Sequence, residues 1–435
     1  MKDAFKMGLR SLLYRKKQYR SLFIVCIFGV GISLFASFLV KGMINSLEYK
    51  AKIYYGGDFQ FFGENPDDNQ KMSERTIAKL KTVFPKDTII TPRYDLNPEY
   101  ASLYFEGMEV QLRMIKGINF DAETEHFKKL NYKEGDASDI KGTNGILISE
   151  KIANTLSVHA GDSVTFLIEN SEHETDTMDV IVKGIFIDSS FFGIYTTYMD
   201  IDFLKKANKY PITWCNRIAI SLKNGAPTEH QVKHYQAALE KLFTMHPQVS
   251  DKKQFYRAEE EWEYYDVDGN FKPLYALIRL NANLDSLQVL IDAMNIVTFF
   301  VIIMLVIIIV VGIASTFRVI IMKRINEIGI YKAIGMQRSK IYMMILVETL
   351  ILVAFGCVGG FIFSGILVLI ANHINLSFIP AFDLFLTNGV LAPVISPKLF
   401  LVISVSICVT TLLAVLCAIK KSVQITPCEA LAATE

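Results

Sequence analysis

The sequence predicts four transmembrane helices and one large extracytoplasmic α+β domain that contains an inserted β-rich subdomain. Two observations lead to this prediction. Of the 435 residues, 51% are hydrophobic and only 20% are charged, whereas an ordinary soluble protein has about 25% charged residues. The apolar residues are also concentrated in four long runs. This composition excludes a disordered chain, a collagen and a small disulfide scaffold.

Each apolar run is long enough to cross a bilayer as a helix. The first run has no charged residue and would be about 30 Å long as a helix. Because a backbone in lipid must satisfy its own hydrogen bonds, we predict a spanning helix for each run. We expect an uncleaved anchor at the first run, since no small-x-small signal cleavage site follows it. The predicted spans are 21–40, 293–317, 341–371 and 399–419.

The positive charges predict the orientation of these spans. Residues 1–20 carry seven Lys and Arg side chains against one acid, and residues 318–340 carry six against one. Residues 372–397 have no Lys or Arg, so they are expected outside. Residues 1–20 are read either as an amphipathic helix at the lipid headgroups or as basic flanking sequence. The predicted cytoplasmic segments are 1–20, 318–340 and 420–435, and the predicted external ones are 41–292 and 372–398.

The external segment alternates predicted strands and helices. The inserted β-rich subdomain is predicted to extend from about residue 117 to about residue 210, with strands at 145–149 and 163–169. Residues 273–292 have apolar side chains at helical spacing, so we expect a helix that continues the second span outward as a stalk. Of the six cysteines only Cys215 falls in the external domain, which excludes a disulfide within it.

No motif predicts a catalytic or metal site in this chain. No GxxxxGK[ST] loop occurs, so a nucleotide-binding loop of that type is absent. His230 and His234 have the spacing of a zinc-binding helix, but Gln231 replaces the glutamate that a metalloprotease needs. We expect an exposed helix face there. The net charge of +1 hides no basic domain, so no nucleic-acid partner is expected.

Small residues in two spans predict close helix packing. Gly356 and Gly360 form a GxxxG pair in the third span, and Gly29 and Ser33 are spaced alike in the first. Packing within the chain and packing against a second copy are both compatible with this pattern. Glu348 is a carboxylate inside the third span, so it needs a partner or a polar cavity. It either pairs with a nearby Arg or Lys or has a functional role.

The segment 318–340 has the most specific pattern. Its Ile, Gly and Ala residues are ordered in a way that positive-inside charge does not explain. We expect Gly329 and Gly335 to break any continuous helix and to let the chain turn. A short basic loop of this kind favours the docking of a cytoplasmic partner.

This segment resembles the R-x-x-E-I-G-x-x-K-A-I-G signature of the FtsX-like permease family of ABC transporters. The tail at 427–431 is similar to the P-x-E-A-L sequence of that family, and residues 145–187 resemble the periplasmic core domain of MacB-type permeases. The matching residues, with the methionine that follows them, are Arg324, Glu327, Ile328, Gly329, Lys332, Ala333, Ile334, Gly335 and Met336.

The resemblance implies a non-catalytic permease subunit of the MacB/LolCDE type in a bacterial cytoplasmic (inner) membrane. Such a subunit would pair with a second copy or a paralogue and bind two copies of a cytoplasmic ABC ATPase through the coupling loop 318–340. ATP and Mg²⁺ would be bound by that partner, and no cofactor by this chain. ATP hydrolysis would then move the external domain, a process termed mechanotransmission.

The resemblance leaves the substrate open. Lipoprotein release and export of a peptide, toxin or drug are the two expectations, with membrane lipid and a periplasmic lipoprotein or membrane-fusion protein as further partners. The alternative is an FtsX-like regulator that activates a cell-wall hydrolase through its external domain.

Overall fold

The computed structural model describes residues 16–424 except 64–71, 98–99, 129, 189, 191, 224, 266–267, 377–378, 380–381 and 388. The chain divides into two units, which we call the helical unit and the sheet unit. The helical unit is Met1–Met43, Asp292–Asn375 and Leu391–Glu435, and the sheet unit is Ile44–Ile291 and Leu376–Val390. The predicted N-terminal amphipathic helix up to residue 15 and the tail from residue 425 onward lie outside the described residues.

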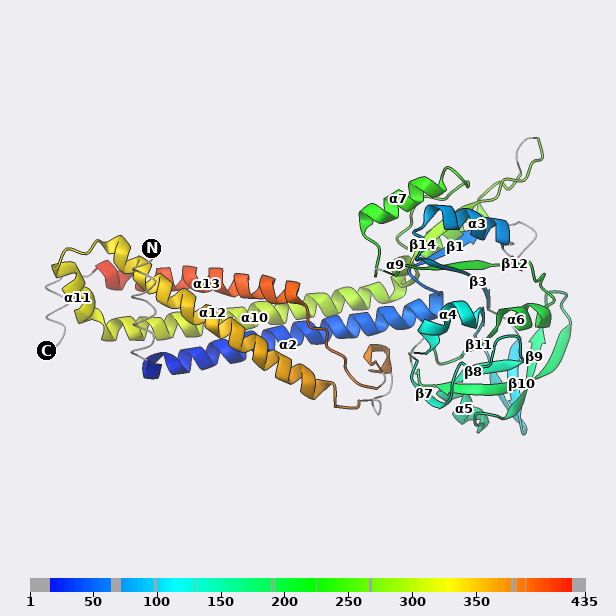
Figure 1. Cartoon of the computed structure of the whole chain (residues 1–435), viewed down its shortest axis with the longest axis horizontal. Helices are drawn as coiled ribbons and strands as arrows, with labels where there is room; N and C mark the ends of the chain where they lie inside the picture. The colour runs from blue at the N-terminus through cyan, green and yellow to red at the C-terminus, as the bar shows by residue number, and fades with distance from the viewer. Residues whose placement is uncertain are drawn as a thin grey trace. The chain divides into compact units, whose positions relative to one another are not determined.

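Four long helices and one short helix pass through the helical unit (Figure 1). The four long ones are apolar and long enough to cross a membrane, and each contains one of the four predicted spans. Together with the sheet unit they confirm the predicted fold class. The helices are α2 (Lys16–Tyr55), α10 (Asp285–Lys323), α11 (Ile325–Ala333), α12 (Arg338–Ala371) and α13 (Pro397–Gln424).

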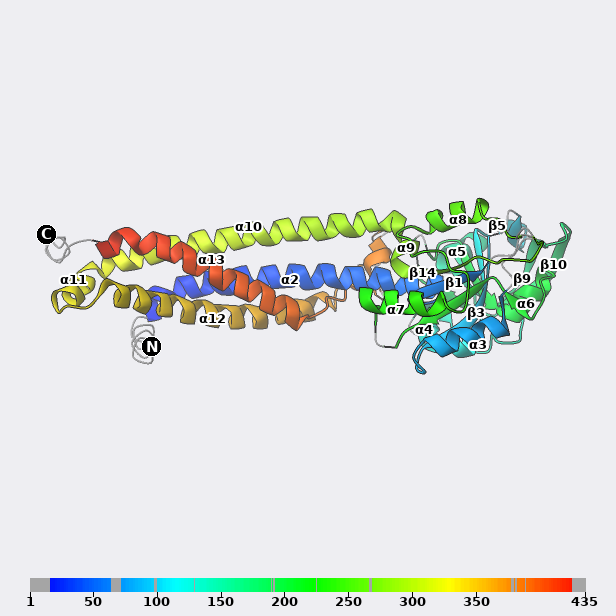
Figure 2. The ribbon, with the colours of Figure 1, turned by 90° about the horizontal axis from the view of Figure 1, so that it is seen from above.

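The core of the helical unit is a cluster of buried aliphatic and aromatic side chains from all four long helices. Leu34 and Phe38 of α2, Ile313 of α10, Ile341 of α12 and Ile407 of α13 belong to it. Helix α12 packs along α13 (Figure 2). Helix α10 is the least enclosed of the four within the chain, so most of its apolar surface is left for lipid or for another chain.

The sheet unit is built on one mixed sheet of twelve strands, in the order β14-β1-β13-β3-β6-β11-β8-β10-β9-β4-β5 with β7 beside β10. A separate pair, β2 and β12, completes the strands. The strands are β1 (Phe59–Gly63), β2 (Met72–Ser73), β3 (Ile89–Leu96), β4 (Ala101–Phe105), β5 (Met108–Gln111), β6 (Met114–Ile118), β7 (Tyr132–Gly135), β8 (Gly145–Ser149), β9 (Ser163–Glu169), β10 (Thr175–Phe186), β11 (Thr196–Asp200), β12 (Trp214–Cys215), β13 (Arg217–Ser221) and β14 (Tyr275–Arg279).

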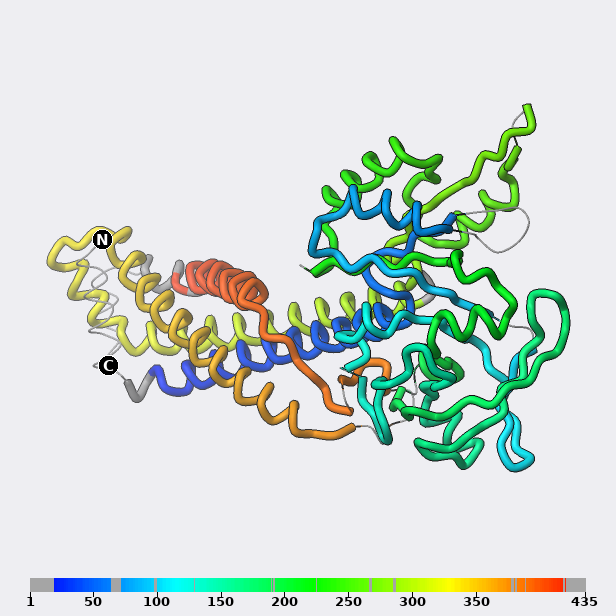
Figure 3. Tube along the Cα trace, turned by 45° about the vertical axis from the view of Figure 1, so that its right-hand side comes forward, coloured from blue at the N-terminus to red at the C-terminus, as the bar shows by residue number. Residues whose placement is uncertain are grey.

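Helices cover both faces of this sheet, and three of its interior strands are fully buried. All five residues of β1, β8 and β11 are buried. Burial on both faces explains the mostly apolar sequences of β1 and β8, whereas β11 also buries Thr196, Thr197 and Asp200. The chain enters the unit along α2 and leaves it through α9 and α10, as the trace in Figure 3 shows. The shorter elements are α3 (Glu74–Val83), α4 (Phe120–Phe127), α5 (Glu150–Leu156), α6 (Ile201–Ala207), α7 (Glu229–Leu239), α8 (Lys252–Glu260), α9 (Leu280–Asn283) and the 3-10 helix η1 (Phe382–Phe385).

Strands inside and outside the range 117–210 belong to the same sheet. Strand β3 pairs with β6 through Arg93 and Ile118, so the expected subdomain continues the sheet of its neighbours. The helix predicted for 273–292 is wrong in its first part, because 275–279 is strand β14. Leu277 packs on one face of the sheet and Ala276 on the other, an alternation that the helical spacing of the leucines concealed.

Candidate functional site

The segment between α10 and α12 forms a short helix set between two breaks. Helix α10 ends at Lys323, and Arg324 precedes α11 with a non-helical backbone. Gly335 ends the segment at φ +83°, in the left-handed region that glycine adopts at low cost. The prediction that Gly329 breaks the helix is wrong, since Gly329 lies buried inside α11. The helix continues through it, and the turn comes only at Gly335.

A buried ionic network lies at the start of α11. The Arg324 guanidinium donates from Nη1 to Glu348 Oε2 at 2.7 Å, and the Tyr19 hydroxyl donates to the same oxygen at 3.1 Å. Arg324 Nε also donates to Glu327 Oε2 at 3.3 Å. Glu348 is completely buried, and Tyr19 and Arg324 are nearly so. One carboxylate therefore connects α2, the start of α11 and α12.

The energetics of this network follow from its burial. The attraction between two buried charges offsets the free energy of desolvation only when their geometry is good. Removing one partner leaves the other charge buried and unpaired, at a cost of about 3–5 kcal/mol. Among the described residues, Glu348 Oε1 has no hydrogen-bond partner. Arg324 and Tyr19 therefore compensate one oxygen of the carboxylate, and the cluster depends on both of them.

The opposite face of α11 is apolar and exposed. Ile330 and Ile334 are 52% and 75% exposed, and Ala333 between them is exposed too. Ala333 is the last residue of α11 and Ile334 is its C-cap, and their spacings of three and four residues from Ile330 place the three side chains on one side of the helix. Lys332 and Met336 are partly buried, and Met336 packs against the core of the unit. Desolvation, and then the charge of Arg338, lower the pKa of Lys332. We call Ile330, Ala333 and Ile334 the apolar face of α11.

The small residues of the spans bring α2 close to two other helices of the same chain. A Cβ built on Gly360 would lie 2.7 Å from Val30 Cβ, and one on Gly356 would lie 2.6 Å from Cys26 Cβ. A Cβ on Gly29 would meet the Ile309 side chain of α10. Ser33 is buried and donates to Gly29 O of its own helix at 2.8 Å. The contacts of these small residues in the structure are thus between helices of one chain.

The other sequence candidates do not assemble into a site. His230 and His234 both lie exposed on α7, and the described part of the chain holds no group of three or more His, Cys, Asp or Glu side chains suited to a metal ion. Sequence reasoning missed Tyr19 altogether. Its only signal is a polar aromatic residue at the edge of an apolar run, a position that tyrosine also takes for interfacial anchoring.

Comparison with known proteins gives one family match. Residues 299–427 match the family described as FtsX-like permease C-terminal, a range that includes α11, its flanking network residues Arg324 and Glu348, and the glycines of α12. No curated protein matches the chain. The crystal structure of the periplasmic region of MacB from Actinobacillus actinomycetemcomitans is similar over 48% of this chain and 95% of that one, at 13% identity. Its TM-score is 0.30, which is too low to be evidence of a shared fold.

Proposed function

We propose that the chain, whose residues 299–427 match the FtsX-like permease C-terminal family, is the membrane subunit of an ABC transporter. In this role it couples ATP hydrolysis by a separate cytoplasmic ATPase to movement of its external sheet unit. The observation that carries this proposal is the buried network of Arg324, Glu348 and Tyr19 at the start of α11. The proposed activity, on the periplasmic side of the membrane, is release of a lipoprotein or export of a peptide, toxin or drug.

The proposal places α11 in the cytoplasm and the sheet unit outside. The six basic residues of 318–340 support this orientation, as do the seven of residues 1–20, because cytoplasmic loops carry an excess of Lys and Arg. Both chain termini are then cytoplasmic. The membrane is the inner membrane of a bacterium, and lipid covers the exposed apolar side chains of α10 that no second permease copy or paralogue covers.

In this proposal the apolar face of α11 is where the ATPase docks. A helix that lies in water gains nothing from exposing two isoleucines, whereas burying each against a partner is worth about 1.5–3 kcal/mol. Ile330, Ala333 and Ile334 would fill a groove of one ATPase subunit, and a second permease copy would bind the second. ATP and Mg²⁺ would be held by the ATPase.

Movement of the docked helix would reach the spans through the network. Arg324 precedes the first residue of α11 and contacts Glu348 of α12, and Glu348 contacts Tyr19 of α2. A displacement of α11 therefore either breaks a buried ion pair or moves α2 and α12 with it. Because breaking the pair costs about 3–5 kcal/mol, joint movement is favoured. Helices α2 and α10 also contribute residues to the sheet unit.

Purification from the native host tests this function. The affinity-tagged full-length chain is isolated from native membranes, and its companions are identified by mass spectrometry. We expect an ABC ATPase at about one copy per permease, and at least a tenfold loss of it in Ile330→Asp and Ile334→Asp. Ser339→Asp is the matched control, because Ser339 is exposed in the first turn of α12, where an acid is well tolerated. Purification that yields the chain with no ATPase would refute the proposal.

A further inference from the structure

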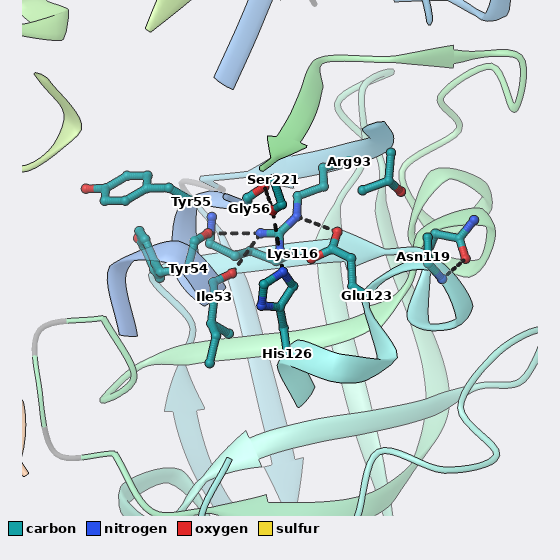
Figure 4. A network of polar contacts seen from close by, with 12 residues as sticks. Ile53, Tyr54, Tyr55, Gly56, Arg93, Lys116, Asn119, Glu123, His126 and Ser221 are labelled. Carbon is teal, nitrogen blue, oxygen red and sulfur yellow. Dashed lines mark hydrogen bonds and ion pairs between the residues drawn. The ribbon is translucent and has the colours of Figure 1, made fainter. Parts of the chain in front are cut away.

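The outer end of α2 lies in a buried polar network (Figure 4). Arg93 of β3 is completely buried, and its Nη1 donates to Ile53 O at 2.9 Å and to Tyr54 O at 3.1 Å. These are carbonyl groups of the last turn of α2, which have no partners within the helix. The guanidinium charge also suits the negative end of the helix dipole. Arg93 thus caps α2 from a strand of the sheet.

Glu123 of α4 fixes the position of Arg93. Its Oε1 accepts from Arg93 Nε at 2.8 Å, and its Oε2 accepts from Nη2. Glu123 is itself buried. A planar guanidinium bound at both carboxylate oxygens has one allowed orientation. One side chain therefore holds α2, β3 and α4 together.

The connection between α2 and the sheet is short and conformationally restricted. Gly56 and Gly57 have φ values of +90° and +127°, and their amides both donate to Lys52 O. A Cβ on Gly56 would lie 2.7 Å from Arg93 Nε. Strand β1 begins two residues after Gly57, and the intervening Asp58 forms an ion pair with Lys52 at 2.6 Å. The backbone turn and the arginine cap thus restrict the same point.

We propose that Arg93 is the joint that makes the end of α2 and the sheet move as one rigid body, and so transfers the movement of α2 to the external unit. This role rests on the proposed function for its purpose, but the rigidity itself holds without any ATPase. An ordinary stabilising arginine would raise the stability of the fold without deciding whether α2 and the sheet move together. The two roles therefore differ in how a variant at Arg93 changes the distance between α2 and the sheet.

The variants must separate the joint from the fold. Arg93→Met alone leaves the Glu123 charge buried without a partner, which would destabilise the unit. The double variant Arg93→Met/Glu123→Met removes both charges at similar volume, so the unit should fold while the cap on α2 is lost. Arg93→Lys keeps the charge for Glu123 but loses the forked geometry. Arg217→Met is the matched control, because Arg217 lies directly opposite Arg93 in the neighbouring strand β13.

The measurement is the distance between spin labels at Glu48 of α2 and Lys151 of α5, two positions with exposed surface. It uses a cysteine-free full-length chain with its native ATPase in lipid nanodiscs, with and without ATP and vanadate. We expect one narrow distribution in the parent chain and in Arg217→Met under both conditions. In the double variant the distribution should become at least about twofold broader or split, as for hinged elements. Arg93→Lys should lie in between.

Two outcomes would contradict the proposal that Arg93 is the joint between α2 and the sheet. One is a distribution in the folded double variant that stays as narrow as in the parent chain, even when its melting temperature falls. The other is an equal broadening in Arg217→Met. The measurement without ATP tests the joint by itself. A narrow parent distribution in a preparation that binds no ATPase would leave the joint standing while the proposed function fails.

Discussion

Arg324 and Glu348 form an ion pair of 2.7 Å between the start of α11 and the buried face of α12. The arginine follows directly on α10 and the glutamate lies ten residues into α12, so the pair fixes how α11 is held against the spans. The Tyr19 hydroxyl on the same carboxylate oxygen adds α2. A helix of nine residues, too short to be stable alone in water, is thereby attached to three of its neighbours.

Removing one charge of this pair should destabilise the chain far more than removing both. Glu348→Ala leaves Arg324 buried and unpaired, at a cost of about 3–5 kcal/mol, whereas Arg324→Met/Glu348→Met should stay within about 1 kcal/mol of the parent chain. Arg318→Met, at an exposed position, is the control. The melting temperature in detergent measures all three. Equal losses in the single and double variants would show that the pair does not hold these helices.

Glu327→Lys should abolish transport-coupled ATPase activity and leave membrane insertion intact. Glu327 is 37% exposed on α11 and accepts from Arg324 Nε. A lysine there would repel Arg324 and disturb both the network and the docking helix. The activity is measured in the complex purified from native membranes, with insertion checked by membrane fractionation. Normal activity in the purified complex would mean that the docking site is assigned to the wrong segment.

The glycines of α12 should differ sharply in their tolerance of a large side chain. Gly360→Leu places its Cβ 2.7 Å from Val30 Cβ and 3.0 Å from the Gly31 amide nitrogen, so α2 and α12 must separate. Overpacking of this kind costs about 1–3 kcal/mol. Gly365→Leu is the matched control, because nothing lies within 4 Å of a Cβ there. Melting temperatures that fall equally in both variants would contradict the observed packing of α2 on α12.

The free energy of unfolding of the sheet unit should rise between pH 8 and pH 10 because of Lys116. Desolvation lowers the pKa of Lys116 from 10.5 to about 8, against the opposing charge of Asp95. In that window the unfolded chain binds more protons than the folded one, so stability increases with pH, by at most about 1.4 kcal/mol per pH unit. Denaturant unfolding followed by the fluorescence of the two tryptophans, Trp214 and Trp262, measures it.

Two lysine variants give the matched comparison for this pH dependence. Lys116→Met should lose the part of the rise that Lys116 contributes. Lys133→Met should keep it, because the Lys133 side chain is 41% exposed. An unchanged pH slope in Lys116→Met would contradict the prediction.

The spans could be predicted from the sequence because a bilayer demands about twenty consecutive apolar residues, a signal that needs no tertiary information. Strand β8 and helix α5 were equally readable, since a buried run ends at Ser149, whose side chain accepts from the Ile152 amide as the helix cap. Strand β14 was not, because its partner β1 lies more than two hundred residues away. Without knowledge of that pairing, the spacing of the leucines favours a helix.

The candidate site was only partly predictable for a similar reason. The sequence places Glu348 in a span, but the partner of its carboxylate depends on how α12 is rotated against α11 and α2. Gly329 was misleading, because glycine takes a left-handed turn at Gly335 but lies within a regular helix at Gly329. Arg93 gave no signal at all, since arginine is almost always exposed and is buried only where partners enclose it.

Site-specific crosslinking from position 334 tests the central claim most directly. A photoreactive amino acid replaces Ile334 in the tagged chain, expressed in the native host and irradiated in intact cells. A covalent adduct with an ABC ATPase is the expected product, and the same residue at position 151 of α5 should give none. An adduct with the ATPase from position 151 and none from position 334 would place the docking site on the wrong side of the membrane and contradict the account.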